Sequence, residues 1–171
     1  CCAACSSSSP SMRDVDLSIV TYQPDFVLLG QLLESIAETA GPELRLTLLV
    51  QDNSPDPAVA AAITAMPECK RGDFARVDMR RSSENLGFGR GHNANAARGN
   101  SPWLLVINQD CVVEPGAIER LVEAAEADDA RVAAWEMRQV PYEHPKAYDP
   151  ATLDTPWVSG AAALFRREAF D

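Results

Sequence analysis

The chain has 171 residues, of which 46% are hydrophobic and 23% charged, and its formal net charge is −10. This length and composition predict one soluble globular domain with a sizeable core, and they exclude a disordered or fibrous chain. The acidic balance argues against nucleic acid as a partner, because binding to phosphate backbones depends on clustered Lys and Arg. No apolar run approaches the ~18 residues that a transmembrane segment needs.

The N-terminal residues 1–11 are rich in Ser and Cys and have no apolar period, so we expect a flexible or non-native tail. An alternative is a lipoprotein that begins at an acylated Cys1. No C-x2-C pair recurs along the chain, which indicates neither a zinc site nor a disulfide framework. A cytoplasmic protein with free thiols is therefore expected.

From Met12 onward, short apolar runs alternate with segments of helical spacing. The expected strands are 16–21, 44–50, 74–79, 103–107, 131–135 and 161–165. The expected helices are 26–36, 58–65, 93–98 and one that opens at Pro115. Residues 139–156 hold four prolines and little periodicity, so they are expected to form a long loop. The alternation predicts an α/β fold with a Rossmann-like, mostly parallel, doubly wound sheet flanked by helices in three layers.

Polar residues follow four consecutive strands of this expected sheet. They lie at 21–23, 52–54, 80–85 and 108–110. In open parallel sheets, ligands bind beyond the carboxyl ends of the strands. Any one of these clusters could consist of ordinary turn residues, since Asn, Asp and Ser favour turns everywhere. Four clusters in register favour a binding site at this edge.

The segment 84–93 is the most unusual in the chain. Gly87, Gly89 and Gly91 alternate with other residues, which would let the backbone approach a ligand closely. A helix beginning near Asn93 would point its free N–H groups at that ligand, and a diphosphate suits such a site. The spacing matches neither the dinucleotide-binding fingerprint nor a P-loop. Flanking arginines would add local positive charge, although exposed arginines are more often plain surface; they are Arg80, Arg81, Arg90 and Arg98.

Asp110 ends a buried strand, with Asn108 two positions before it. This arrangement fits Mg2+ or Mn2+, which takes one or two protein carboxylates and completes its shell with water and phosphate oxygens. The ion would neutralise charge on a departing diphosphate. The alternative is that Asp110 is a loop residue or a helix cap ahead of Pro115.

Taken in order, these motifs resemble family 2 of the glycosyltransferases, which has the GT-A fold, and the rhamnosyltransferase-like branch is the most similar. The resemblance covers residues 15–171. The motifs that carry it are LSIVTY at 17–22, DNS at 52–54, ENLGFGRGHN at 84–93, LVINQD at 105–110, WVSGAA at 157–162 and RRE at 166–168.

The resemblance implies inverting transfer of a sugar, rhamnose-like or another hexose, from a dTDP- or UDP-linked donor. The acceptor would be a hydroxyl of a glycan or a lipid-linked molecule in polysaccharide biosynthesis, in the cytoplasm or at the inner face of the membrane. A divalent cation, Mg2+ or Mn2+, is the implied cofactor. The implied nucleotide-binding residues are Thr21, Tyr22, Asp52, Asn85, Gly87, Arg90, Asn93 and Asn108, with Asp52 accepting a hydrogen bond from a pyrimidine N–H. The implied metal ligand is Asp110, and the donor-sugar and acceptor residues are Trp157, Gly160 and Ala161.

The sequence departs from the family's pattern in two places. Asn108 replaces the first Asp of the D-x-D motif, which removes one carboxylate from the metal site. The family's catalytic base, which must take the acceptor proton, is expected beyond Asp171. Residues 12–171 are therefore expected to form a nucleotide-sugar-binding domain that is incomplete at its C-terminus. Neither His92 nor His144 is a good substitute for the base.

Two other functions stay open. The chain could bind nucleotide without turnover, as a non-catalytic domain or a truncated remnant. It could also be a sugar-phosphate nucleotidyltransferase, although that class normally has a glycine-rich loop with a basic residue after the first strand. The residues at that position, 21–24, have neither.

Overall fold

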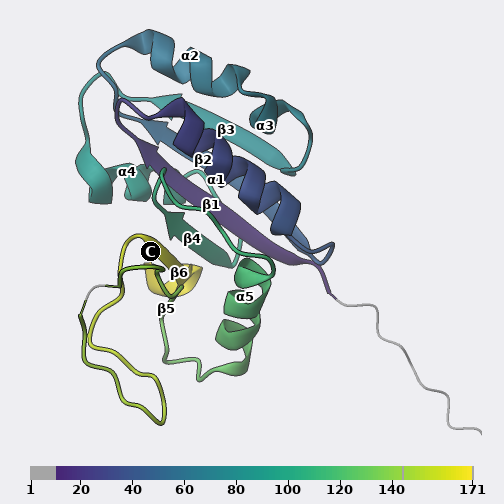
Figure 1. The fold of residues 1–171 in the computed structure, drawn as a ribbon, viewed down its shortest axis with the longest axis vertical. Helices are drawn as coiled ribbons and strands as arrows, with labels where there is room; N and C mark the ends of the chain where they lie inside the picture. The colour runs from purple at the N-terminus through teal and green to yellow at the C-terminus, as the bar shows by residue number, and fades with distance from the viewer. Residues whose placement is uncertain (1–10, 144, 171) are drawn as a thin grey trace, which may run out of the picture.

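The computed structural model describes residues 11–143 and 145–170, so most of the expected tail, together with His144 and Asp171, lies outside the described residues. Six strands form one sheet in the order β3-β2-β1-β4-β6-β5 (Figure 1). The strands are β1 (Arg13–Thr21), β2 (Leu44–Asp52), β3 (Arg76–Arg81), β4 (Trp103–Ile107), β5 (Ala134–Glu136) and β6 (Ala162–Arg166). The helices are α1 (Phe26–Thr39), α2 (Pro57–Ala65), α3 (Pro67–Lys70), α4 (Gly87–Ala96), α5 (Ala117–Ala127) and α6 (Arg167–Phe170).

The sheet is mostly parallel, as predicted, with an antiparallel strand near one edge that the sequence did not indicate. Strands β1 to β4 pair in parallel, as predicted. Strand β6 instead runs antiparallel between β4 and β5. The long connection 137–161 returns the chain to the edge of β4 in the opposite direction, and apolar periodicity carries no information about strand direction. The expectation of a mostly parallel α/β sheet flanked by helices is confirmed.

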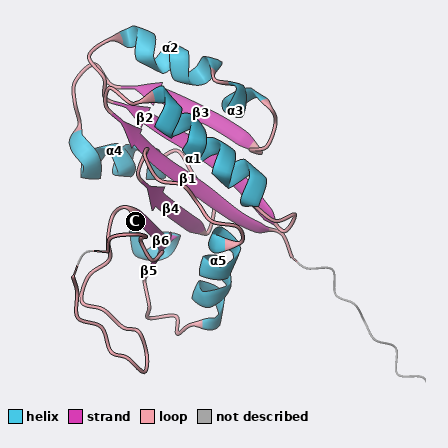
Figure 2. Ribbon diagram, in the orientation of Figure 1, coloured by secondary structure: helices cyan, strands magenta, loops and turns pink. Residues whose placement is uncertain are grey.

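Helices cover both faces of the sheet and give it three layers (Figure 2). Because side chains alternate along a strand, β1 sends Val15, Leu17 and Ile19 to one face, where they are fully buried in the main core. Helices α1 and α5 pack on that face. On the other face a smaller cluster joins α4 and α6 to β4 and β6 through Ala96 and Phe165, among others.

Helix α4 differs from its prediction, since it begins at Gly87 and contains all three alternating glycines. Glycine disfavours helix, which is why the sequence suggested a loop up to Asn93. Packing explains why residue 91 is a glycine, because an added Cβ would lie 2.7 Å from a methyl group of Val20 on β1. Only a glycine there lets α4 lie this close to the sheet. Gly87 has φ = +72°, a conformation that also favours glycine.

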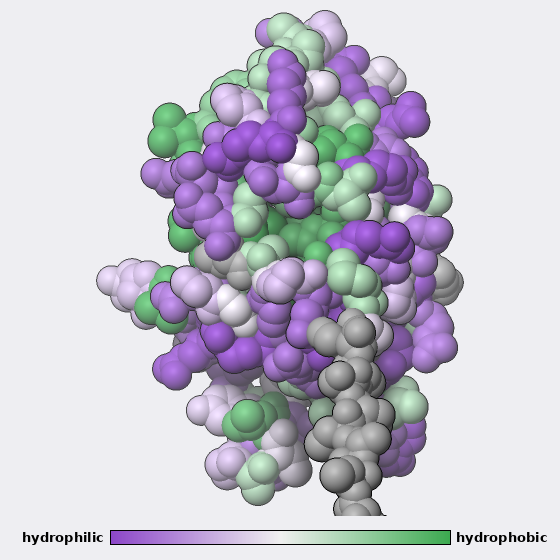
Figure 3. Space-filling view, turned by 90° about the vertical axis from the view of Figure 1, so that its right-hand side faces the viewer, coloured by the Kyte–Doolittle hydropathy of each residue, from purple (hydrophilic) through white to green (hydrophobic). Residues whose placement is uncertain are grey.

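Among the described residues, no helix is both long and apolar enough to cross a membrane. The face of the molecule seen in Figure 3 is mostly hydrophilic, with a hydrophobic strip across its middle.

A buried ion pair joins β1 to the first residue of α6. Arg167 donates to Asp16, and their side chains are only 13% and 1% exposed. The same guanidinium donates to the backbone carbonyls of Ala96 and Ser101, while Asp16 also accepts from the backbone and hydroxyl of Ser101. The glycine at position 99 provides the space for this ion pair, because a Cβ there would lie 2.0 Å from the Asp16 carboxylate. Four separate segments therefore depend on one pair.

Replacing Arg167 with Met should lower the free energy of unfolding by about 3–5 kcal/mol, because it leaves the Asp16 charge buried without a counter-charge. Urea unfolding followed by circular dichroism measures this. The matched control is Arg131→Met, since Arg131 is 89% exposed and pairs with Asp129 at the surface. That control should change stability by less than about 0.5 kcal/mol. Equal effects of the two variants would contradict the role given to Arg167.

Candidate functional site

A cleft of about 350 Å³ opens at the carboxyl ends of β1, β2 and β4. The position agrees with the rule that ligands bind where parallel strands end. The lining residues come from the segments after these strands and from the start of α4: they are Val20, Thr21, Tyr22, Asn53, Asn85, Gly87, Phe88, Asn108, Gln109 and Asp110. The structure thus brings together six of the predicted nucleotide- and metal-binding residues from three separate motifs.

Asp52 lies beneath this cleft and is fully buried. One carboxylate oxygen, Oδ1, accepts hydrogen bonds from the Thr21 hydroxyl at 2.9 Å and from the Ser54 hydroxyl at 2.6 Å. The other oxygen, Oδ2, is buried and has no partner among the described residues, and the same holds for Oδ1 of Asn53. A buried acceptor without a donor costs about 1–3 kcal/mol. Two such acceptors side by side in sequence indicate a place for a hydrogen-bond donor from outside the chain.

The start of α4 forms another wall. The Asn85 side chain accepts a 2.8 Å hydrogen bond from the Gly87 N–H, which holds the entry to the helix. Phe88 is 51% exposed and lines the cleft, with its ring edge-on to His92 at a centroid distance of 4.3 Å. Gly160 packs against the same ring, since an added Cβ would lie 3.0 Å from it. The predicted donor-sugar residue Gly160 is therefore next to the cleft.

Arg90 and Asn93 are not among the residues that line the cleft. They are exposed on α4, and the Arg90 guanidinium donates back to the Leu86 carbonyl at 3.0 Å. Both were predicted to bind nucleotide from the family resemblance. Because this segment is helical from Gly87, their side chains are distributed around a helix.

The other three arginines of the expected positive cluster are engaged within the fold. Arg80 and Arg98 form ion pairs with Asp78, at 3.2 and 3.3 Å. Arg81 donates to the Pro55 carbonyl at 2.9 Å. None of the four arginines lines the cleft, and the side chains that do line it carry one formal charge, the carboxylate of Asp110.

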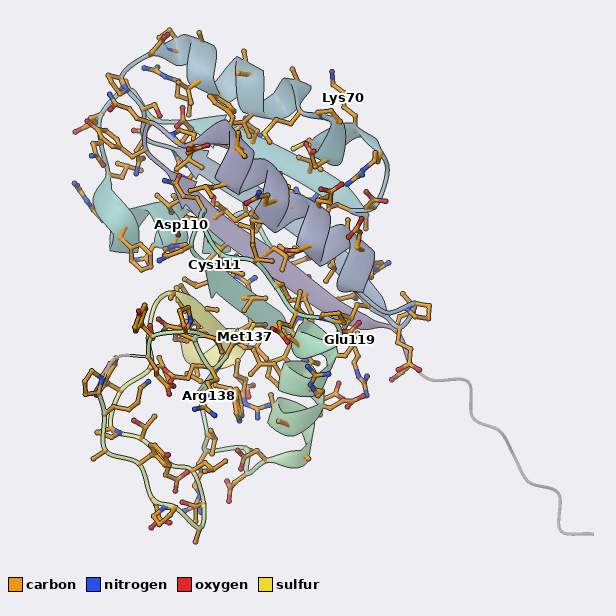
Figure 4. The ribbon with its side chains drawn as sticks, viewed as in Figure 1. Lys70, Asp110, Cys111, Glu119, Met137 and Arg138 are labelled. Atoms are coloured by element: carbon orange, nitrogen blue, oxygen red, sulfur yellow. The ribbon has the colours of Figure 1, made fainter. Side chains whose placement is uncertain are left out.

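Asp110 also lines a second and larger cavity of about 910 Å³, mostly apolar, between α5 and residues 137–142. Figure 4 shows Asp110 and Cys111 after β4, with Met137 and Arg138 below them. Ala161 lines this second cavity too, and its carbonyl accepts a 2.9 Å hydrogen bond from the Asn108 N–H. The predicted sugar and acceptor segment therefore lies at the boundary between the two spaces. Trp157 lines neither.

Four lining residues were missed by sequence reasoning: Val20, Asn53, Phe88 and Gln109. Asn53 and Gln109 stand beside predicted residues, at the ends of β2 and β4, so their place in the two motifs was the signal. Phe88 is a large apolar residue between two glycines, and its exposure could not be read from periodicity.

Comparison with solved structures identifies the fold. A mannosyltransferase from Pyrobaculum calidifontis, PcManGT, in complex with GDP-Man and Mn2+, superposes with a TM-score of 0.69 at 17% identity. S. aureus TarS in complex with UDP-GlcNAc superposes with a TM-score of 0.63 at 16% identity. They cover 95% and 90% of this chain. The chain therefore has the fold of the GT-A glycosyltransferases.

The family follows from the sequence itself. The model of glycosyl transferase family 2 matches residues 17–148, and the chain belongs to that family. No curated protein gives a significant match. The chain spans 48% of the length of the PcManGT chain and 45% of that of the TarS 1–349 chain.

The buried imidazole of His92, which contacts Phe88 in the cleft wall, has a lowered pKa. His92 is 3% exposed, and its Nδ1 lies 2.7 Å from the Ser18 hydroxyl on β1. Asn95 donates to the same hydroxyl at 2.9 Å, while Nε2 of His92 has no partner in the part of the chain that the structure describes. Burial disfavours the imidazolium and lowers the pKa of His92 from 6.5 to about 4.

The folded protein should consequently lose stability as the pH falls from about 6.5 to 4. In that window the unfolded chain binds a proton at His92 that the folded chain does not, so unfolding is favoured by up to about 3 kcal/mol. Urea unfolding at pH 7.0, 5.5 and 4.5 measures the slope, and His92→Asn should flatten it. An unchanged slope in the variant would show that other groups cause the acid sensitivity.

Proposed function

We propose that the chain is the nucleotide-sugar-binding domain of a glycosyltransferase that moves a sugar to an acceptor hydroxyl. The observation that carries the proposal is the cleft itself. In a chain of glycosyl transferase family 2, residues from the ends of β1, β2 and β4 and from the start of α4 meet around one carboxylate and two buried oxygens that have no partner among the described residues. Residues 12–171 form the donor-binding part of the enzyme.

The nucleobase binds at the end of the cleft formed by Thr21, Tyr22 and Asn53. Tyr22 is 48% exposed and offers an aromatic face for stacking. The free oxygen of Asp52 accepts a hydrogen bond from the base. A uracil or thymine ring has an N–H that suits the Asp52 carboxylate, so UDP- and dTDP-linked sugars are the proposed donors.

The diphosphate binds toward Asp110, and the local charge makes a cation necessary. Two negatively charged phosphates would otherwise meet a carboxylate, with no arginine or lysine in the lining. The donors present are oxygens, which suit Mg2+ or Mn2+. Within the described residues no three His, Cys, Asp or Glu side chains form a metal-binding group. Asp110 would therefore hold an ion that takes its remaining ligands from the phosphates and water.

When bound, such an ion neutralises charge on the departing diphosphate. In the reaction, the acceptor oxygen attacks the anomeric carbon and the bond from that carbon to the diphosphate oxygen breaks, with inversion. The residues of this chain orient the donor: Thr21 and Asp52 at the base, and the 157–161 segment at the sugar. We assign the general base to no cleft residue, because Asp110 is committed to the metal. A rhamnose-like or other hexose is the proposed sugar, and a glycan or lipid-linked hydroxyl the acceptor.

Asp52→Asn tests the nucleotide site. The amide keeps one oxygen for Thr21 and Ser54 but sets an N–H₂ where the free oxygen stood, so donor faces donor. The Kd for UDP or dTDP, measured by calorimetry with Mn2+, should rise by about tenfold to a hundredfold. Asp56→Asn is the matched control, because Asn caps α2 as well as Asp does. A parent chain that binds no nucleoside diphosphate would refute the proposed function.

Asp110→Ala tests the metal. UDP or dTDP with Mn2+ should raise the melting temperature of the parent chain, since a ligand that binds only the folded state stabilises it. The variant should lose the part of this rise that depends on Mn2+ and keep the part seen with EDTA. Asp154→Ala removes an exposed carboxylate from the 139–156 loop and should behave as the parent does. A rise that is independent of Mn2+ in the parent chain would contradict the metal assignment.

A further inference from the structure

One lysine is buried within the long loop that joins β5 to β6. The side chain of Lys146 is 5% exposed and forms an ion pair with Glu136, whose side chain is 15% exposed. The ammonium group also lies 4.2 Å from the centre of the Trp157 ring. A lysine is rarely buried unless its charge is paired, so the contacts with Glu136 and Trp157 account for the burial of Lys146.

Glu136, which ends β5, is hydrogen-bonded to two places in the loop between β5 and β6. Glu136 uses one oxygen for Lys146 and the other to accept a 2.5 Å hydrogen bond from the Ser159 N–H. The Ser159 hydroxyl accepts a 2.6 Å hydrogen bond from the Gln139 side chain. We call the five residues that make these contacts the Lys146 clasp; they are Glu136, Gln139, Lys146, Trp157 and Ser159.

The Lys146 clasp is connected to the cleft by hydrogen bonds and by packing. The Ser159 hydroxyl accepts from the Ala161 N–H at 3.3 Å, and the Ala161 carbonyl accepts from the Asn108 N–H at 2.9 Å. Between them, Gly160 rests against Phe88 in the cleft wall. Glu136 therefore holds the 159–161 backbone, which is hydrogen-bonded to Asn108 near Asp110.

A buried ion pair of this kind fixes geometry more than it adds stability, because desolvating the two charges offsets most of their attraction. The consequence of losing it falls on the 157–161 segment. At the nucleobase end, the Asp52 side chain bonds to Thr21 and Ser54, neither of which belongs to the Lys146 clasp. The two ends of the site are thus separable by mutation.

We infer that Lys146 and Glu136 are positioning residues for the sugar of the donor. They hold the 157–161 segment in place beside Asn108 and Asp110, so they govern recognition of the sugar and leave binding of the nucleotide unchanged. This inference rests on the proposed function, and it adds a determinant of sugar specificity from outside the cleft.

The test compares a nucleotide with its sugar conjugate. Kd values for UDP and UDP-GlcNAc, and for dTDP and dTDP-rhamnose, are measured by calorimetry with Mn2+ on the parent chain, Lys146→Met and Glu136→Gln. For the pair that the parent binds, both variants should weaken the nucleotide sugar by about tenfold, as expected for misaligned hydrogen bonds, and change the nucleoside diphosphate by less than about twofold. Lys146→Arg keeps the charge and should recover part of the loss.

The chain offers a matched control, because its only other lysine is Lys70. Lys70 is exposed on α3, well away from Asp110 and the 139–156 loop (Figure 4), and Lys70→Met should change neither Kd. Acetylation of the parent chain followed by mass spectrometry is a second measurement that needs no variant to fold. Lys70 should react at least about ten times faster than Lys146.

The outcomes separate the two ideas. If the parent binds no nucleoside diphosphate, the proposed function fails and the inference fails with it. If the parent binds both the nucleoside diphosphate and the nucleotide sugar, and Lys146→Met leaves both Kd values unchanged, only the inference is overturned. An equal loss for both ligands, or equal acetylation of the two lysines, also overturns it, because the Lys146 clasp would then be a general support or would not exist.

Discussion

The structure depends on the buried pair of Asp16 and Arg167. Arg167 follows β6 directly, and its backbone N–H donates to the Pro102 carbonyl just before β4. Its guanidinium reaches β1 and the end of α4, so the antiparallel strand β6 can occupy one place beside β4. That place brings Ala161 to Asn108. A charge pair on one face of the sheet thereby sets the backbone of the candidate site at its edge.

Part of the fold was predictable because burial leaves a simple pattern. Strand β4 is an apolar run without alternation, as expected for a strand covered on both faces, whereas β1 and β2 alternate apolar with polar residues over part of their length, which also indicates a strand. The direction of β6 was not predictable, since it depends on the path of the 137–161 connection. Helix α4 was predicted from Asn93 onward because glycines disfavour helix, whereas the close contact of Gly91 with Val20 decides its real extent.

The candidate site shows the same division. The rule that parallel strands deliver their ends to one edge was enough to bring Thr21, Asp52 and Asp110 to the region of one cleft. It could not supply Phe88, whose role depends on where α4 begins. The nearness of Gly160 was expected only from the family resemblance, because no local pattern records a contact between residues so far apart in the chain. Sequence periodicity thus predicts which edge binds, while tertiary packing decides which side chains line it.

The charge distribution changes the argument for the ligand. Arginines gathered around a glycine-rich segment suggested a positive site, but Arg80 and Arg98 neutralise Asp78, and Arg81 binds carbonyl groups. The cleft keeps one carboxylate and no cation of its own. Under the proposed function, attraction for a diphosphate then has to come from an ion that the carboxylate recruits, so recognition of the phosphates and of the metal would be one event. For a chain with a net charge of −10, this coupling keeps polyanions without a bound metal away from the site.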